Sequence, residues 1–107
     1  MSAAAAAALG PPPLLVDAQY WNNIAATPPD FMLMAGVFGL TLHAGTWGTG
    51  AVLKRYNTLG DAYVAMGAAI TADGYAEYHC PSGQYQLTMT GMSGVTGSIE
   101  KIGQWGG

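Results

Sequence analysis

The chain has 107 residues, enough for one small domain, and its Asp, Glu, Lys and Arg content of 8% compares with roughly 25% in an ordinary soluble protein. Its only cations, Lys54, Arg55 and Lys101, are too few for a phosphate-binding patch, which argues against a nucleic-acid partner. So few charges protect a surface poorly against association, so we expect other protein copies, or less readily lipid, to cover much of it.

Residues 1–35 are expected to form a low-complexity arm and an extended docking segment. Six alanines are followed by the triplet Pro11 to Pro13, which stops a helix and imposes an extended path. No basic residue precedes Lys54, which argues against a secretory signal. The apolar stretch Leu14 to Phe31 has no sustained period, so it either lies on another protein or folds back on its own domain. In the first case the partner-binding residues are Leu14, Leu15, Val16, Tyr20, Trp21, Ile24 and Phe31.

The stretch Phe31 to Leu53 contains no charged residue and is followed at once by Lys54 and Arg55. Its length fits a membrane-spanning helix. Five glycines dilute the apolar run, however, and Phe38, Leu40 and Leu42 alternate with small or polar residues. This period of two favours two strands joined by a tight turn at Trp47 to Gly50.

The remaining chain predicts further strands separated by turns. A loop at residues 57–61 precedes a short strand at residues 62–70. Residues 74–91 predict a β-hairpin with a turn at Pro81-Ser82-Gly83, and Val95 to Ile102 forms the last strand before a short tail, 104–107. About six strands at this spacing predict an all-β fold, a small antiparallel, jelly-roll-like β-sandwich over residues 36–103. The inward side chains are expected to be Phe38, Leu40, Leu42, Leu53, Val64, Met66, Ala76, Tyr78, Cys80, Tyr85, Leu87, Met89, Val95 and Ile99.

The sequence offers little chemistry. His43, His79 and Cys80 lack metal-ligand spacing, and no phosphate-binding or nucleophile motif occurs. A set of Ser82, His79 and Glu77 would lie along one exposed strand with nothing to enclose a substrate. We therefore expect no enzyme activity, no catalytic residue, no cofactor and no metal.

The pattern of turns and alternation from Gly36 to Ile102 resembles small virion proteins of tailed bacteriophages. It consists of GLTLHAGTWGTGAVLKRYN, AYVAMGAAI, TADGYAEYHCPSGQYQLTMTG and a final strand, over about two-thirds of the chain. Cys80 stands where the pattern would have an aliphatic residue. The resemblance implies a β-sandwich that serves as a head-decoration (cement), neck or tail-fibre module.

The leading hypothesis is a non-enzymatic capsid decoration protein on the virion surface. It would be a homo-oligomer, with a trimer favoured, that binds the major capsid protein or another virion protein across capsid subunits. The first alternative is a tail-fibre, neck or spike module that binds a host glycan, with Trp47, Tyr56 and Trp105 as candidate aromatics. The second alternative is a small membrane-complex subunit that spans the bilayer once at Met32 to Leu53.

Overall fold

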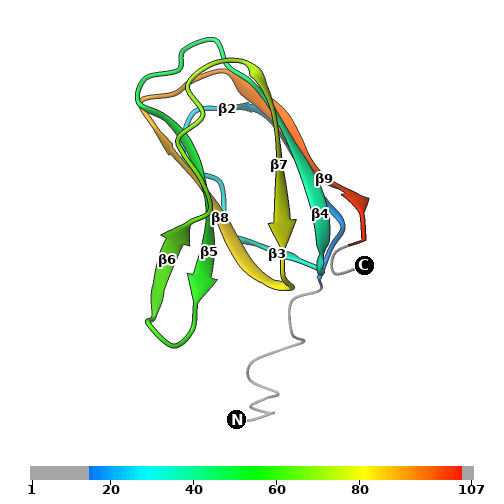
Figure 1. Ribbon diagram of the computed structural model, residues 1–107. Helices are drawn as coiled ribbons and strands as arrows, with labels where there is room; N and C mark the ends of the chain where they lie inside the picture. The colour runs from blue at the N-terminus through cyan, green and yellow to red at the C-terminus, as the bar shows by residue number, and fades with distance from the viewer. Residues whose placement is uncertain (1–14, 105–107) are drawn as a thin grey trace, which may run out of the picture.

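Eight strands, two more than expected, form two antiparallel sheets packed face to face in the computed structural model, which describes residues 15–104 (Figure 1). The Ala/Pro-rich arm, Leu14 and Trp105 lie outside these residues. Sheet I has the order β2 (Ala18–Ile24), β9 (Val95–Gly103), β4 (Gly36–His43), β7 (Gly74–Cys80). Sheet II has the order β3 (Phe31–Leu33), β8 (Gly83–Thr90), β5 (Gly50–Asn57), β6 (Ala62–Ala65).

The strands pair as one long hairpin that has been folded over. β5 pairs with β6, β4 with β7, β3 with β8 and β2 with β9, so each pair encloses the one before it. Folding the long hairpin then brings β4 beside β9 and β5 beside β8, which completes the two sheets. Eight strands wound in this way form a jelly roll, and the expected all-β sandwich is confirmed.

Two expected hairpins are wrong, although their strands exist. β7 and β8 belong to different sheets, so Pro81 and Ser82 carry the chain across the sandwich instead of forming a hairpin turn. β4 and β5 are likewise in different sheets, and the segment from Ala44 to Thr49 crosses between them. Alternation of apolar residues identifies the buried face of a strand, but it does not identify the neighbouring strand.

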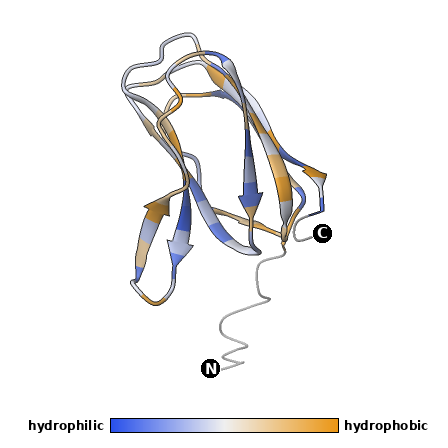
Figure 2. Cartoon of the chain, in the orientation of Figure 1, coloured by the Kyte–Doolittle hydropathy of each residue, from blue (hydrophilic) through white to orange (hydrophobic). Residues whose placement is uncertain are grey.

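The core lies between the sheets and contains most of the expected side chains. Figure 2 shows bands of hydrophobic and hydrophilic residues along the strands, as one buried face requires. Met66 and Tyr78 are half-buried against this core. Val64 is 52% exposed, so its expected burial is wrong, because β6 extends beyond the cover of sheet I. The buried set is Trp21, Phe31, Leu33, Phe38, Leu40, Leu42, Ala44, Ala51, Leu53, Cys80, Tyr85, Leu87, Met89, Met92, Val95 and Ile99.

The sandwich begins near residue 16, not at residue 36. The Val16 amide donates to the Met32 carbonyl at 3.0 Å and places the chain beside β3 in sheet II. The next residue, Asp17, accepts a 2.8 Å hydrogen bond from the Lys101 amide of β9 in sheet I. This N-terminal segment therefore supplies one strand to each sheet, β2 and β3. Of the two open interpretations of this segment, the structure has the one in which it folds back on its own domain.

Residues 31–53 comprise β3, β4, the first half of β5 and the connections between them, so a helix from Met32 to Leu53 is wrong. The low charge of this stretch suggested a membrane helix, but the alternation of Phe38, Leu40 and Leu42 indicated a strand, and β4 is a strand. Within residues 15–104, no helix has the length and apolar character needed to cross a membrane.

Candidate interaction surfaces

The residues expected to bind a partner separate into two groups. Trp21 and Phe31 are each only 6% exposed, and their rings pack edge to face at 5.6 Å inside the sandwich. Val16 and Ile24 are half-buried against the same core. Leu15 and Tyr20 are exposed, at 44% and 65%. Of the expected contact residues that the structure describes, these two have the most exposed side chains.

The most prominent surface is the β5–β6 hairpin, residues 54–65, which extends away from the sandwich (Figure 1). Pairing between β5 and β8 ends at Arg55 and Tyr85, whereas β5 stays paired with β6 as far as Asn57 and Ala62. Leu59 lies in the turn and is 99% exposed. Where exposed apolar side chains gather on one surface, they mark a contact with another molecule.

A notch lies where the hairpin separates from β8. It has a volume of about 550 Å³, and its lining contains one cation, Arg55, but no acidic residue. The Arg55 Nε is buried and has no hydrogen-bond partner among the described residues. A guanidinium in such a notch is suited to bind a carboxylate. The lining residues are Met32, Arg55, Tyr56, Asn57, Thr58, Leu59, Ser82, Gly83 and Gln84.

The outer face of sheet II carries a hydrogen-bond network that ties the hairpin to the loop before β3. Asp30 accepts hydrogen bonds from the Tyr63 hydroxyl of β6 and from Gln84 and Gln86 of β8, the latter two at 3.0 and 3.1 Å. The Tyr63 hydrogen bond is the main cause that lowers the pKa of Asp30. Tyr63 also packs edge to face on Tyr56 at 5.3 Å. The network holds the base of the hairpin in one orientation.

The outer face of sheet I presents a second surface, made of tyrosines and glutamates. The Tyr20 hydroxyl of β2 donates to Glu100 at 3.0 Å, and the Tyr75 hydroxyl of β7 donates to Glu77 at 2.9 Å. These hydrogen bonds are the largest cause that raises the pKa of each tyrosine, so both hydroxyls stay protonated at neutral pH. We call this surface, residues Tyr20, Gly39, Thr41, Tyr75, Glu77, Ser98 and Glu100, the tyrosine face.

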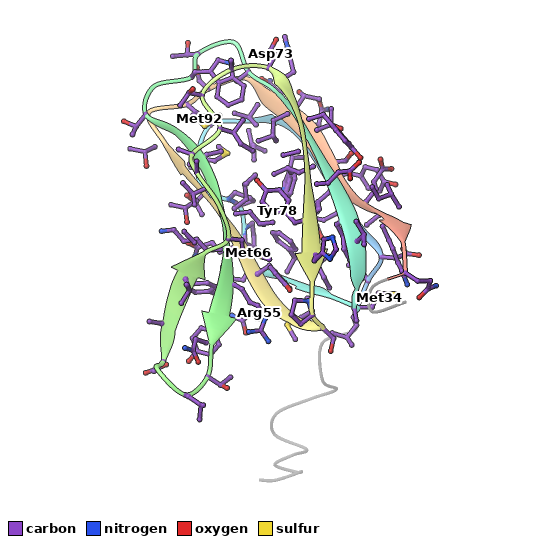
Figure 3. All side chains as sticks on the ribbon, viewed as in Figure 1. Met34, Arg55, Met66, Asp73, Tyr78 and Met92 are labelled. Atoms are coloured by element: carbon purple, nitrogen blue, oxygen red, sulfur yellow. The ribbon has the colours of Figure 1, made fainter. Side chains whose placement is uncertain are left out.

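Three polar side chains gather at one end of the sandwich, opposite Arg55 and Met34 (Figure 3). Asp73 accepts hydrogen bonds from the Ala44 amide at 3.2 Å, from His43 Nδ1 at 2.7 Å and from Trp47 Nε1 at 3.0 Å. The Ala44 hydrogen bond is the largest cause that lowers the pKa of Asp73, followed by those of His43 and Trp47. The cluster fixes the loop after β4 against the loop before β7. Trp47, a candidate glycan contact, is thus engaged through its indole nitrogen.

The residues considered for catalysis are not assembled. Ser82 lines the notch, and no hydrogen bond joins it to His79 or Glu77 on β7. Cys80 is fully buried, and desolvation raises the pKa of its thiol to about 11, so it stays protonated and inaccessible. Within residues 15–104, no three His, Cys, Asp or Glu side chains are grouped so that they could hold a metal ion.

No protein-family model, curated protein or solved structure matches this chain. Jelly rolls serve as viral capsid domains, lectins and other modules, so the fold alone does not select a function. Sequence reasoning named Tyr20 as a contact residue but missed its partner Glu100, the pair Tyr75–Glu77 and Leu59 at the hairpin tip.

Proposed function

We propose that this protein is a non-enzymatic structural protein of a virion, a decoration protein that binds across neighbouring capsid subunits and stabilises the head. The observation that carries the proposal is the β5–β6 hairpin, which projects from the sandwich with Leu59 99% exposed. The scarcity of charge supports it, because a chain with only 8% charged residues leaves much of its surface uncharged and suited to burial against other proteins.

The hairpin offers a partner three kinds of contact. β6 lies at the edge of sheet II and carries no charged residue, so half of its backbone N–H and C=O groups are free to pair with an extended segment of a capsid subunit. Leu59 would contribute about 1.5–3 kcal/mol if a partner buried it fully. Arg55 in the notch would bind a carboxylate of the same partner.

The proposal includes a homo-oligomer, with a trimer favoured. Each hairpin contact is small, and several copies that bind together would convert weak contacts into stable attachment. Light scattering of the purified protein should then give a particle mass of three chains of 11.0 kDa. A single-chain mass at working concentration would remove the oligomer from the proposal and leave the hairpin contact to be tested alone.

The hairpin contact is tested by rebinding. Particles prepared without this protein are mixed with purified wild-type chain, with Leu59→Asp or with Ile102→Asp, and the bound chain is counted after sedimentation. Both residues are exposed, Leu59 at 99% and Ile102 at 51%, so neither change should affect folding. Leu59→Asp is expected to lose attachment and Ile102→Asp, on sheet I, to keep it. Equal attachment of the two variants would remove the hairpin from the contact.

The stabilising role has its own measurement. Particles with and without the protein are heated, and the release of nucleic acid is followed. We expect release at a lower temperature without it, and restoration by wild-type chain but not by Leu59→Asp. Equal heat resistance in both preparations would eliminate the cement role.

A further inference from the structure

The Tyr75 side chain lies over Gly39 on the outer face of sheet I, where residue 39 has no side chain of its own. A Cβ built on Gly39 would stand 2.5 Å from the Tyr75 hydroxyl oxygen and 2.7 Å from its Cε1. The ring therefore occupies the space that any other residue at position 39 would fill. Tyr75 is nevertheless 56% exposed, so the side of the ring that faces away from Gly39 is open to water.

Two glutamates flank the same glycine. Gly39 of β4 is in register with Glu100 of β9 on one side and with Glu77 of β7 on the other. Their Cα atoms are therefore separated by two inter-strand steps, about 10 Å. Tyr20 reaches Glu100 from the β2 edge as Tyr75 reaches Glu77 from the β7 edge. The two tyrosine side chains thus approach the middle of the sheet from opposite edges.

A row of hydroxyl groups joins the two tyrosines. Thr41 is in register with Tyr75 and with Ser98, and Ser98 is in register with Tyr20. All four residues lie on the outer face. The second oxygen of each glutamate, Oε1, accepts no hydrogen bond from the described residues. The face therefore combines flat aromatic surface with fixed carboxylate acceptors and small hydroxyl donors.

Stability alone does not account for this arrangement. Glycine inside a strand costs about 0.5–1 kcal/mol relative to alanine, and a ring left 56% in water recovers only part of that through burial. Both tyrosine hydroxyls are also held by carboxylates on an exposed surface, where such bonds contribute little to folding. What the arrangement achieves is an exposed aromatic ring held over Gly39, with carboxylate acceptors on the two neighbouring strands.

We propose that the tyrosine face binds a neutral saccharide. The apolar C–H face of a sugar ring stacks on a flat aromatic ring, and sugar hydroxyls donate to carboxylates such as Glu77 and Glu100. The two negative charges disfavour sugars that carry carboxylate or sulfate groups. This inference goes beyond the capsid role and does not depend on it, because the tyrosine face is on sheet I and the hairpin belongs to sheet II.

The test is a titration of the ¹⁵N-labelled full chain with three neutral oligosaccharides, namely cellohexaose, maltohexaose and chitohexaose. Amide shifts are expected at Gly39, Thr41, Tyr75 and Ser98 with at least one of them. Tyr75→Ala should weaken that binding about tenfold or more, since the stacking surface is lost. Tyr56→Ala, a matched aromatic change on the β5–β6 hairpin, should leave the affinity unchanged.

Gly39→Ala tests whether saccharide binding needs the Tyr75 ring in its place over residue 39, as well as the presence of the ring. The three atoms nearest the added methyl group all belong to the Tyr75 side chain, which can swing away, so the fold should survive while the ring leaves its place over residue 39. Binding should fall as far as in Tyr75→Ala, with an unchanged far-ultraviolet spectrum. No amide shift with any of the three oligosaccharides, shifts confined to the hairpin, or full affinity in both variants would overturn the proposal. The Leu59→Asp variant should bind the saccharide normally, so loss of the capsid contact can be distinguished from loss of saccharide binding.

Discussion

Replacing Phe31 by alanine tests whether the N-terminal segment is part of the folded domain. Its ring is 6% exposed, packs edge to face on Trp21 at 5.6 Å, and stacks on Tyr85 at 6.4 Å. Removing a buried phenylalanine side chain costs about 3–5 kcal/mol, from lost burial and from the cavity that remains. Small domains have a total stability of about 5–15 kcal/mol, so the variant should lose about a fifth or more of its free energy of unfolding.

The assay is urea unfolding followed by tryptophan fluorescence. With a slope of about 2 kcal/mol per M for a domain of this size, the midpoint should fall by about 2 M. Phe31→Leu should lose less than half as much, because it keeps most of the volume. Leu59→Ala, at a position 99% exposed, should leave the midpoint unchanged. A Phe31→Ala midpoint equal to wild type would refute the assignment of β3 to the sandwich core and favour a segment that docks elsewhere.

Three further outcomes are expected. Gly97→Ala should unfold the domain, since its Cβ would stand 2.0 Å from a backbone oxygen of β4, whereas Gly67→Ala, with 3.6 Å to its nearest neighbour, should melt near the wild-type temperature. Cys80 should react with a thiol reagent at pH 8 only after unfolding, because it is buried and its pKa is raised to about 11. The pKa of Asp73 is lowered in the folded protein, so the stability that this carboxylate contributes is complete above its unfolded pKa of about 3.8. That stability is lost as the pH falls through the lower pKa of the folded state. Asp73→Asn should therefore flatten the acid dependence of the melting temperature.

Strand positions and buried faces were predictable because they follow from alternation within a few residues. Phe38, Leu40 and Leu42 on β4, and Leu87 and Met89 on β8, are buried as their period of two required. Which strands pair depends on contacts between distant parts of the chain. The pairing that folds residues 74–91 across the sandwich leaves no local signal, since a Pro-x-Gly sequence suits a crossing between sheets as well as a hairpin turn.

The N-terminal strands were missed for a different reason. Asn22, Asn23 and the prolines at 28 and 29 interrupt the apolar pattern, which made the segment resemble an arm. A weak signal was present, because Trp21 points inward while Tyr20 and Asn22 are exposed, as in a short strand. The interruption at Asn23 coincides with a positive φ of 52° and with a register irregularity in β2.

The tyrosine face could not be predicted from the sequence. Tyr20 and Tyr75 are far apart in the chain, and they share one surface only because β9 and β4 lie between their strands in a particular register. A shift of one residue in β4 would turn Gly39 inward and place a bulky apolar side chain, Phe38 or Leu40, under the ring. Identification of the face therefore needed the sheet order as well as the sequence.

The nested pairing of strands also implies an order in which the native state should assemble. β5 and β6 are joined by the short connection 58–61, whereas β2 and β9 are separated by residues 25–94. Closing a long loop costs more entropy than closing a short one, but each inner pair that has formed shortens the span that the next must close. The strand pairs should thus form in the order β5–β6, β4–β7, β3–β8 and β2–β9. Substitutions in β5 and β6 should slow refolding, and those in β2 should mainly accelerate unfolding.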